Sequence, residues 1–104
     1  MSYFSTQTAT VDLGGGNTVT LRKLNFGDMM DIWSAPALYT GPETTFGQRF
    51  TAEMTKRAIT GWEGPDFEGR GVSPENIAQL PLGIFNKLIP DAVSLNRMGE
   101  EEGN

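Results

Sequence analysis

The feature that most limits the fold is a pair of alternating segments near the N-terminus, separated by glycines. In residues 8–13, apolar and polar side chains alternate, which is the period of a strand with one buried face. Residues 18–24 alternate in the same way. Between them, residues 14–17 are three glycines and an asparagine, which adopt the positive φ angles of tight turns readily. We therefore predict an antiparallel β-hairpin.

Asn25 predicts the start of a helix directly after the hairpin. Asparagine is a favoured N-cap, and Asp28 stands three residues later as a weaker form of the capping-box glutamate. The helix would end at about Ala35, because Pro36 cannot continue it. Its apolar side consists of Met29, Met30, Ile32 and Trp33. We predict a core role for this side, with a partner-binding surface as the alternative, since methionine suits adaptable surfaces.

A longer amphipathic helix is predicted after a loop at residues 35–45. Phe46, Phe50, Met54 and Ala58 recur every four residues, which places them on one helical face, and the helix would end near Gly61. This apolar stripe is more typical of a core than of a cofactor site.

Residues 61–71 are predicted to form a surface loop held to the core by Trp62 and Phe67. Glu63, Asp66 and Glu68 are oxygen donors of the kind that hard cations prefer. Their spacing does not match the EF-hand pattern, and no complete ligand set is visible. The loop interpretation is therefore favoured over a cation site.

Two further helices are predicted in the second half of the chain. Ser73 followed by Pro74 is a strong helix start, and this short helix would run to Leu80. Pro81 would begin another helix that reaches Asn96, in which Pro90 produces a kink or a restart. The apolar side of this last helix consists of Leu82, Phe85, Leu88 and Ile89.

The length of 104 residues fits one domain. We predict an α+β fold, in which an N-terminal β-hairpin precedes a small, mainly α-helical body and a flexible acidic C-terminal tail. The expected parts are a flexible N-terminus at residues 1–7, a single domain at residues 8–96 and a disordered tail at residues 97–104. The tail prediction rests on three consecutive glutamates with no apolar residue after Met98.

Composition argues against catalysis and against several binding roles. The chain has no histidine and no cysteine, which removes the usual general base, the usual zinc ligands and thiolate chemistry. We expect no enzyme activity, no cofactor and no metal. The net charge of −5 disfavours nonspecific nucleic-acid binding. Neither a signal peptide nor an apolar run of about 20 residues is present, so we expect a cytoplasmic protein without a membrane partner.

Three segments of the chain carry recognisable motifs. Residues 21–28, Leu-Arg-Lys-Leu-Asn-Phe-Gly-Asp, lead from a predicted strand into a helix. Residues 57–64, Arg-Ala-Ile-Thr-Gly-Trp-Glu-Gly, contain a Trp-x-Gly loop, and residues 71–77, Gly-Val-Ser-Pro-Glu-Asn-Ile, contain a Val-x-Pro-Glu-Asn helix start. Together these segments resemble tail assembly chaperones of long-tailed bacteriophages. The resemblance covers residues 21–96, and these motifs are structural rather than catalytic.

The resemblance implies a protein of the host cytoplasm that binds the tape measure protein, tail tube subunits, or both during tail assembly. It implies no active site. The candidate partner-binding residues are Met30, Trp33, Phe46 and Phe50, each with a core role as the alternative. Homo-oligomer formation stays open. Such chaperones are often made in two lengths by ribosomal slippage, and we expect this chain to be the short form, since codons for residues 102–104 can contain a slippery run.

Three other classes compete with this hypothesis. A small structural virion protein, such as a head-tail joining or tail-completion subunit, is the main alternative. An acidic nucleic-acid mimic ranks third, because the only dense acidic run is Glu100 to Glu102. An enzyme ranks last, since Asp28 and Asp31 share a predicted helix face without a nucleophile or base beside them.

Overall fold

A computed structural model describes residue 4 and residues 7–39 and 45–96 of the chain. The helices and strands, in chain order, are β1 (Thr8–Gly14), β2 (Asn17–Arg22), α1 (Phe26–Ser34), the 3-10 turn η1 (Pro36–Leu38), α2 (Phe46–Ala58), β3 (Ile59–Glu63), the 3-10 turn η2 (Pro65–Phe67), α3 (Pro74–Ala78) and α4 (Leu82–Leu95). The predicted tail at residues 97–104, and most of the predicted flexible N-terminus, lie outside the described residues.

The predicted hairpin is confirmed. Strands β1 and β2 pair antiparallel, with Val11 opposite Val19, and the register shifts between Asp12 and Gly14. The three glycines of the turn all have positive φ angles of 64° to 86°. The inward side chains Val11, Val19 and Leu21 are buried, whereas the threonines between them are less so. The fold class, a hairpin followed by a mainly helical body, is also confirmed.

A third strand replaces part of the predicted loop. Helix α2 ends at Ala58 rather than near Gly61, and β3 pairs antiparallel with β2, giving the order β1-β2-β3. Trp62 lies opposite Val19 and Ile59 opposite Leu21, with a register shift on the way. The prediction failed because β3 is short, irregular and contains a glycine, so its own pattern does not alternate. Its position depends on its partner strand.

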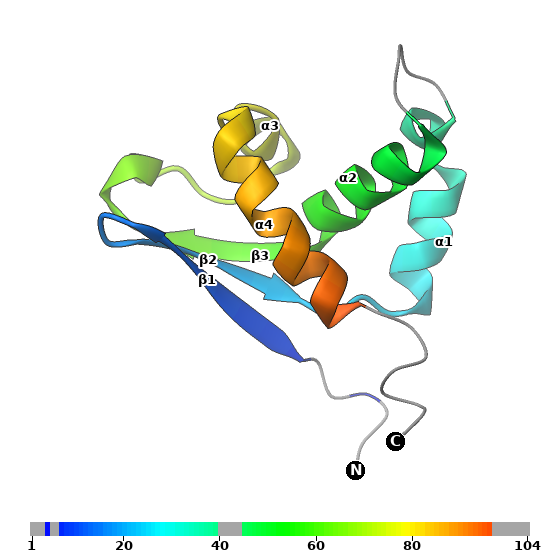
Figure 1. Ribbon diagram of the computed structural model, residues 1–104, viewed down its shortest axis with the longest axis horizontal. Coiled ribbons are helices and arrows are strands. Elements are labelled where there is room, and N and C mark those ends of the chain that lie inside the picture. Colours follow the sequence, from blue (N-terminus) through cyan, green and yellow to red (C-terminus); the bar gives the residue numbers. More distant parts are fainter. Residues whose placement is uncertain (1–3, 5–6, 40–44, 97–104) are drawn as a thin grey trace.

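Helix α4 covers one face of the sheet, with the short helix α3 beside its beginning (Figure 1). The main core lies between α4, the sheet and the end of α2. Its buried residues are Val11, Val19, Leu21, Ala58, Ile59, Leu88 and Ala92. Trp62 and Phe67 pack against this core and stack on each other with ring centroids 4.8 Å apart, as predicted for the loop.

Helix α1, η1 and α2 form a second group at one end of the molecule (Figure 1). Ile32, Leu38 and Met54 form a smaller buried cluster there, against which Phe50 and Met29 pack. Leu24, in the connection between β2 and α1, packs against both clusters. The described residues therefore form two apolar centres that share the side chain of Leu24.

Helix α4 is continuous through Pro90, so the helix does not restart there. Pro90 and Asn86, whose carbonyl would have bonded to residue 90, are both exposed, and water can satisfy that carbonyl. On the apolar side of this helix, Leu88 is buried and Phe85 and Ile89 are half-buried. Leu82, at the start of the helix, belongs to the same predicted side but is 74% exposed.

Candidate protein-binding surface

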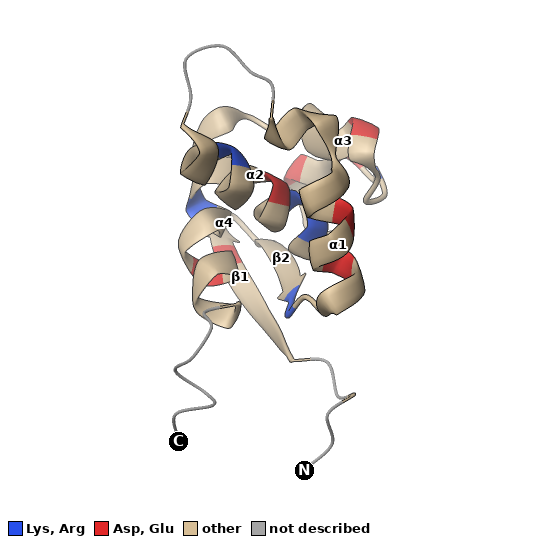
Figure 2. Ribbon diagram, turned by 90° about the vertical axis from the view of Figure 1, so that its right-hand side faces the viewer, with Lys and Arg blue, Asp and Glu red and all other residues tan. Residues whose placement is uncertain are grey.

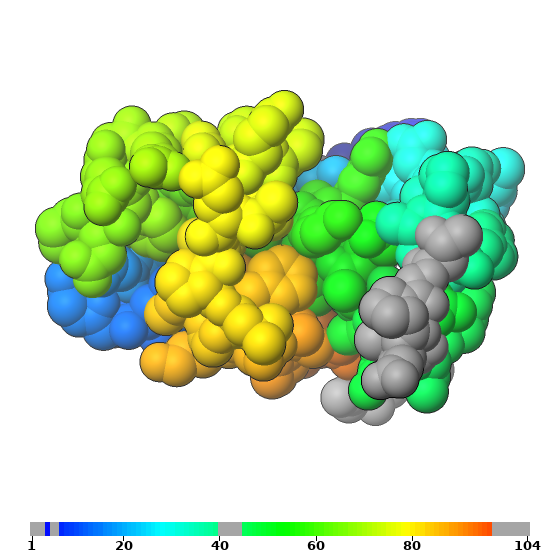
Figure 3. Space-filling view, turned by 90° about the horizontal axis from the view of Figure 1, so that it is seen from above, coloured from blue at the N-terminus to red at the C-terminus, as the bar shows by residue number. Residues whose placement is uncertain are grey.

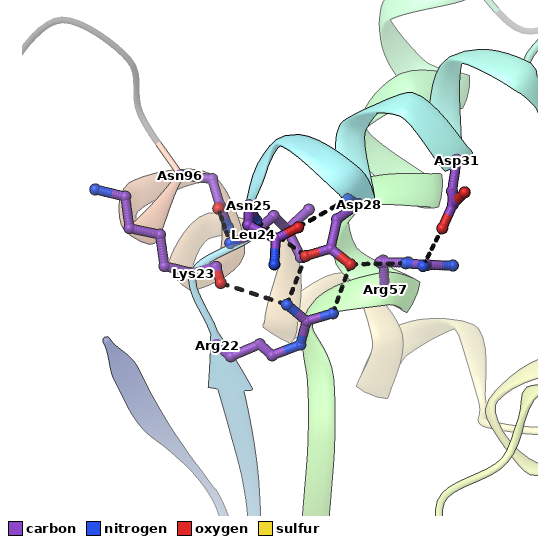
Figure 4. Close-up of polar contacts among 8 residues, drawn as sticks. All are labelled: Arg22, Lys23, Leu24, Asn25, Asp28, Asp31, Arg57 and Asn96. Carbon is purple, nitrogen blue, oxygen red and sulfur yellow. Dashed lines mark hydrogen bonds and ion pairs between the residues drawn. The ribbon is translucent and has the colours of Figure 1, made fainter. Parts of the chain in front are cut away.

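The position of α1 is set by a network of charged groups centred on Asp28 (Figure 4). The predicted capping box is confirmed, since the backbone N–H of Asp28 donates to Asn25 Oδ1 and the N–H of Asn25 donates to Asp28 Oδ2, both at 2.9 Å. These bonds satisfy two backbone donors at the start of the helix.

Two arginines from other elements bind the same carboxylate. Arg22 of β2 donates from Nη1 to Asp28 Oδ2 at 2.6 Å and from Nη2 to Oδ1 at 2.9 Å. Arg57 of α2 donates from Nε to Asp28 Oδ1 at 3.1 Å and from Nη2 to Asp31. The acidic positions of α1 thus lie beside basic positions of β2 and α2 (Figure 2). Asp28 and Asp31, weighed above as a carboxylate pair, serve as ion-pair partners.

The hydrogen bonds from Arg22 lower the pKa of Asp28 well below its usual range. Burial of the carboxylate opposes this shift, and the bonds from Asn25 and Arg57 add to it. The same pairing raises the pKa of Arg22. Asp28 is therefore ionised at neutral pH and holds α1 against both β2 and α2.

Helix α1 turns a row of large apolar side chains toward solvent. Met30 is 46% exposed and Trp33, one turn further, is 43% exposed. Phe46, at the start of α2, is 49% exposed. The ring of Tyr39 lies 6.1 Å from that of Phe46, and its hydroxyl donates to the carbonyl of Trp33 at 2.5 Å. We call the exposed residues Met30, Trp33, Tyr39 and Phe46 the aromatic surface.

Phe50 lies between this surface and the smaller buried cluster. Its ring lies 6.4 Å from that of Phe46, and it packs against the cluster of Ile32, Leu38 and Met54. Among the four candidate partner-binding residues, Met30, Trp33 and Phe46 are exposed and Phe50 is half-buried. The predicted core role of the apolar side of α1 is thus correct for Ile32 and wrong for Met30 and Trp33.

Tyr39 was missed by the sequence analysis, although it connects Trp33 to Phe46. It follows η1 in a segment interpreted only as a loop. The sequence does contain a signal for this contact. Tyr39 follows Pro36, which ends the helix, by three residues, and an aromatic side chain at that distance can fold back onto the preceding helix. The backbone at this point is held further by Arg49, whose Nε donates to the carbonyl of Leu38 at 2.7 Å.

Glu63, Asp66 and Glu68, the three carboxylates considered as cation ligands, do not form a cluster. Within residues 7–39 and 45–96, no group of three or more His, Cys, Asp or Glu side chains is placed to hold a metal ion. Glu68 lies 3.6 Å from Arg70, and Asp66 accepts a hydrogen bond from Asn17 instead.

Comparison of the chain with protein-family models, curated proteins and solved structures found no match. In the part of the chain that the structure describes, no helix is long and apolar enough to cross a membrane.

Proposed function

We propose that this protein is a tail assembly chaperone that binds the tape measure protein, tail tube subunits, or both in the host cytoplasm, and that it works without catalysis. The observation that carries the proposal is the aromatic surface. Met30 and Trp33 are exposed three residues apart on α1, and the exposed Tyr39 after η1 contacts both the carbonyl of Trp33 and the exposed ring of Phe46 on α2. Exposed patches of this kind mark sites for other proteins.

The chemistry of the aromatic surface fits an apolar helical partner. Tryptophan, tyrosine and phenylalanine supply large contact areas with little loss of side-chain entropy, and aromatic residues are enriched at binding hot spots. Methionine adapts its shape to different partners. The net charge of −5 would keep a complex dispersed while the apolar stripe of a long partner is covered.

The proposal is tested by coexpressing the chain with the tape measure protein of the same genome. Wild type should keep that protein in the supernatant and bind it, whereas Trp33→Gln and Phe46→Gln should each weaken binding about 30-fold, as expected for a hot-spot aromatic. Because both side chains are about half exposed, the free energy of unfolding should change by only about 1 kcal/mol.

Leu82→Gln is the matched control, since Leu82 is a large exposed apolar residue on α4, outside the aromatic surface. It should leave binding unchanged. Equal binding by all variants would contradict the proposed surface. A stoichiometric amount of this chain in purified virions, measured by mass spectrometry, would favour a structural virion protein instead.

A further inference from the structure

A groove of about 440 Å³ lies between the hairpin turn, η2 and the beginning of α4, and includes none of the residues of the aromatic surface. Figure 3 shows these segments together, with the turn in blue, η2 in yellow-green and the start of α4 in yellow. Its apolar walls are Leu13, Phe67, Leu80, Pro81 and Ile84. Four of these side chains are half-buried and Pro81 is exposed, so the groove is open to solvent.

The polar end of the groove is built by Asn17, a side chain that is almost fully buried. Its Nδ2 donates to the carbonyl of Gly14 at 3.0 Å and to Asp66 Oδ2 at 2.8 Å. Its Oδ1 accepts from the backbone N–H of Asp66 at 3.0 Å. One buried amide therefore joins the hairpin turn to η2, and the groove is formed before any ligand arrives.

Asp66 places a negative charge at this end of the groove. Its side chain is exposed, and its described contacts are those with Asn17. Among the described residues, no lysine or arginine forms a salt bridge with it. An unpaired carboxylate beside an apolar groove is complementary to a cationic group that follows an apolar one.

We propose that this groove binds a short peptide segment of a partner protein, in which a bulky apolar side chain precedes or follows a lysine or arginine. The apolar side chain lies against Leu80 and Ile84, and the basic side chain pairs with Asp66. The groove is open, and the exposed Gly14 and Gly15 line one wall. It therefore suits an extended peptide better than a small molecule, which usually binds in an enclosed pocket. This second binding site does not depend on the proposed function.

The test selects a phage-displayed library of random 12-residue peptides on the full chain and titrates the enriched peptides by fluorescence polarisation. Enriched peptides should contain the apolar-basic pair. Nuclear magnetic resonance should show shifts at the amides of Gly14, Gly15, Phe67 and Ile84. Asp66→Asn, which keeps an oxygen to accept the Asn17 bond, should weaken binding about fivefold, and 1 M salt should remove that difference.

Glu68→Gln is the matched control, because Glu68 is an acidic residue next to η2 that does not line the groove. It should leave binding unchanged. Failure to enrich any peptide, or equal affinity for wild type and Asp66→Asn, would overturn the proposal. So would amide shifts confined to α1 and α2, an outcome that would support the aromatic surface and leave the groove without a ligand.

Discussion

Replacing Asp28 with asparagine is expected to lower the free energy of unfolding by about 3 kcal/mol. The carboxylate is 8% exposed and holds Arg22 and Arg57 in place. Asparagine offers only one acceptor oxygen and no charge, so both guanidinium groups lose most of their pairing. Chemical denaturation at pH 7 measures the effect. Asp31→Asn is the control, because Asp31 is 60% exposed and Arg57 is its one ion-pair partner among the described residues, and it should cost less than about 1 kcal/mol.

The pH dependence of stability provides a second readout of the same group. The pKa of Asp28 is depressed in the folded state, so its contribution is complete above the unfolded value of 3.8 and is lost as the pH falls below it. Wild type should therefore lose stability steeply between pH 4 and pH 2, as estimated from this linkage. Asp28→Asn should show a flatter acid limb, and parallel curves for the two proteins would contradict this role.

Gly64→Ala is expected to destabilise the protein by about 4 kcal/mol, enough to unfold much of a marginally stable chain. Gly64 has a φ angle of 138°, which side-chain-bearing residues rarely adopt. A Cβ atom there would lie 2.2 Å from Asn17 Oδ1 and 2.6 Å from Asn17 Cα. The change would separate η2 from the hairpin turn. Thermal and urea unfolding, followed by circular dichroism, measure the loss.

Gly61→Ala is the matched control for this glycine. It lies three residues earlier in β3, and an added Cβ would meet nothing within 4 Å. Alanine also loses less conformational entropy than glycine on folding, so Gly61→Ala should be neutral or slightly stabilising. If Gly64→Ala and Gly61→Ala were equally stable, the close contact between η2 and the hairpin turn at Asn17 would not be needed for stability.

Local signals in the sequence were sufficient for much of the fold. The alternation around the triple glycine predicted β1 and β2, and Asn25 and Ser73 predicted the starts of α1 and α3, because hairpin turns and N-caps depend on nearby residues. Strand β3 was missed because its pairing depends on β2, 40 or so residues away in sequence. The local residue pattern of a strand does not indicate which distant strand it pairs with.

The two proposed binding surfaces were harder to predict from the sequence. A helical pattern places Met30 and Ile32 on α1 but does not decide which of them faces the core. The bonds from Arg22 and Arg57 to Asp28 help to fix the orientation of α1, and these two arginines are separated in the sequence by all of α1 and most of α2. The groove at Asp66 likewise requires the fold to bring distant segments together.

The two apolar centres that share Leu24 have a consequence for how the protein opens. Among the described residues, seven buried side chains hold the sheet, α4 and the end of α2 together, whereas three hold α1, η1 and α2 together. We expect the smaller centre to open as a separate cooperative unit, at a lower free energy than global unfolding. Native-state hydrogen exchange should then group the amides of α1 below those of β2, and a single common exchange free energy would contradict it. Such opening would expose Phe50 and Ile32 and so enlarge the apolar area next to Trp33 that the proposed partner would contact.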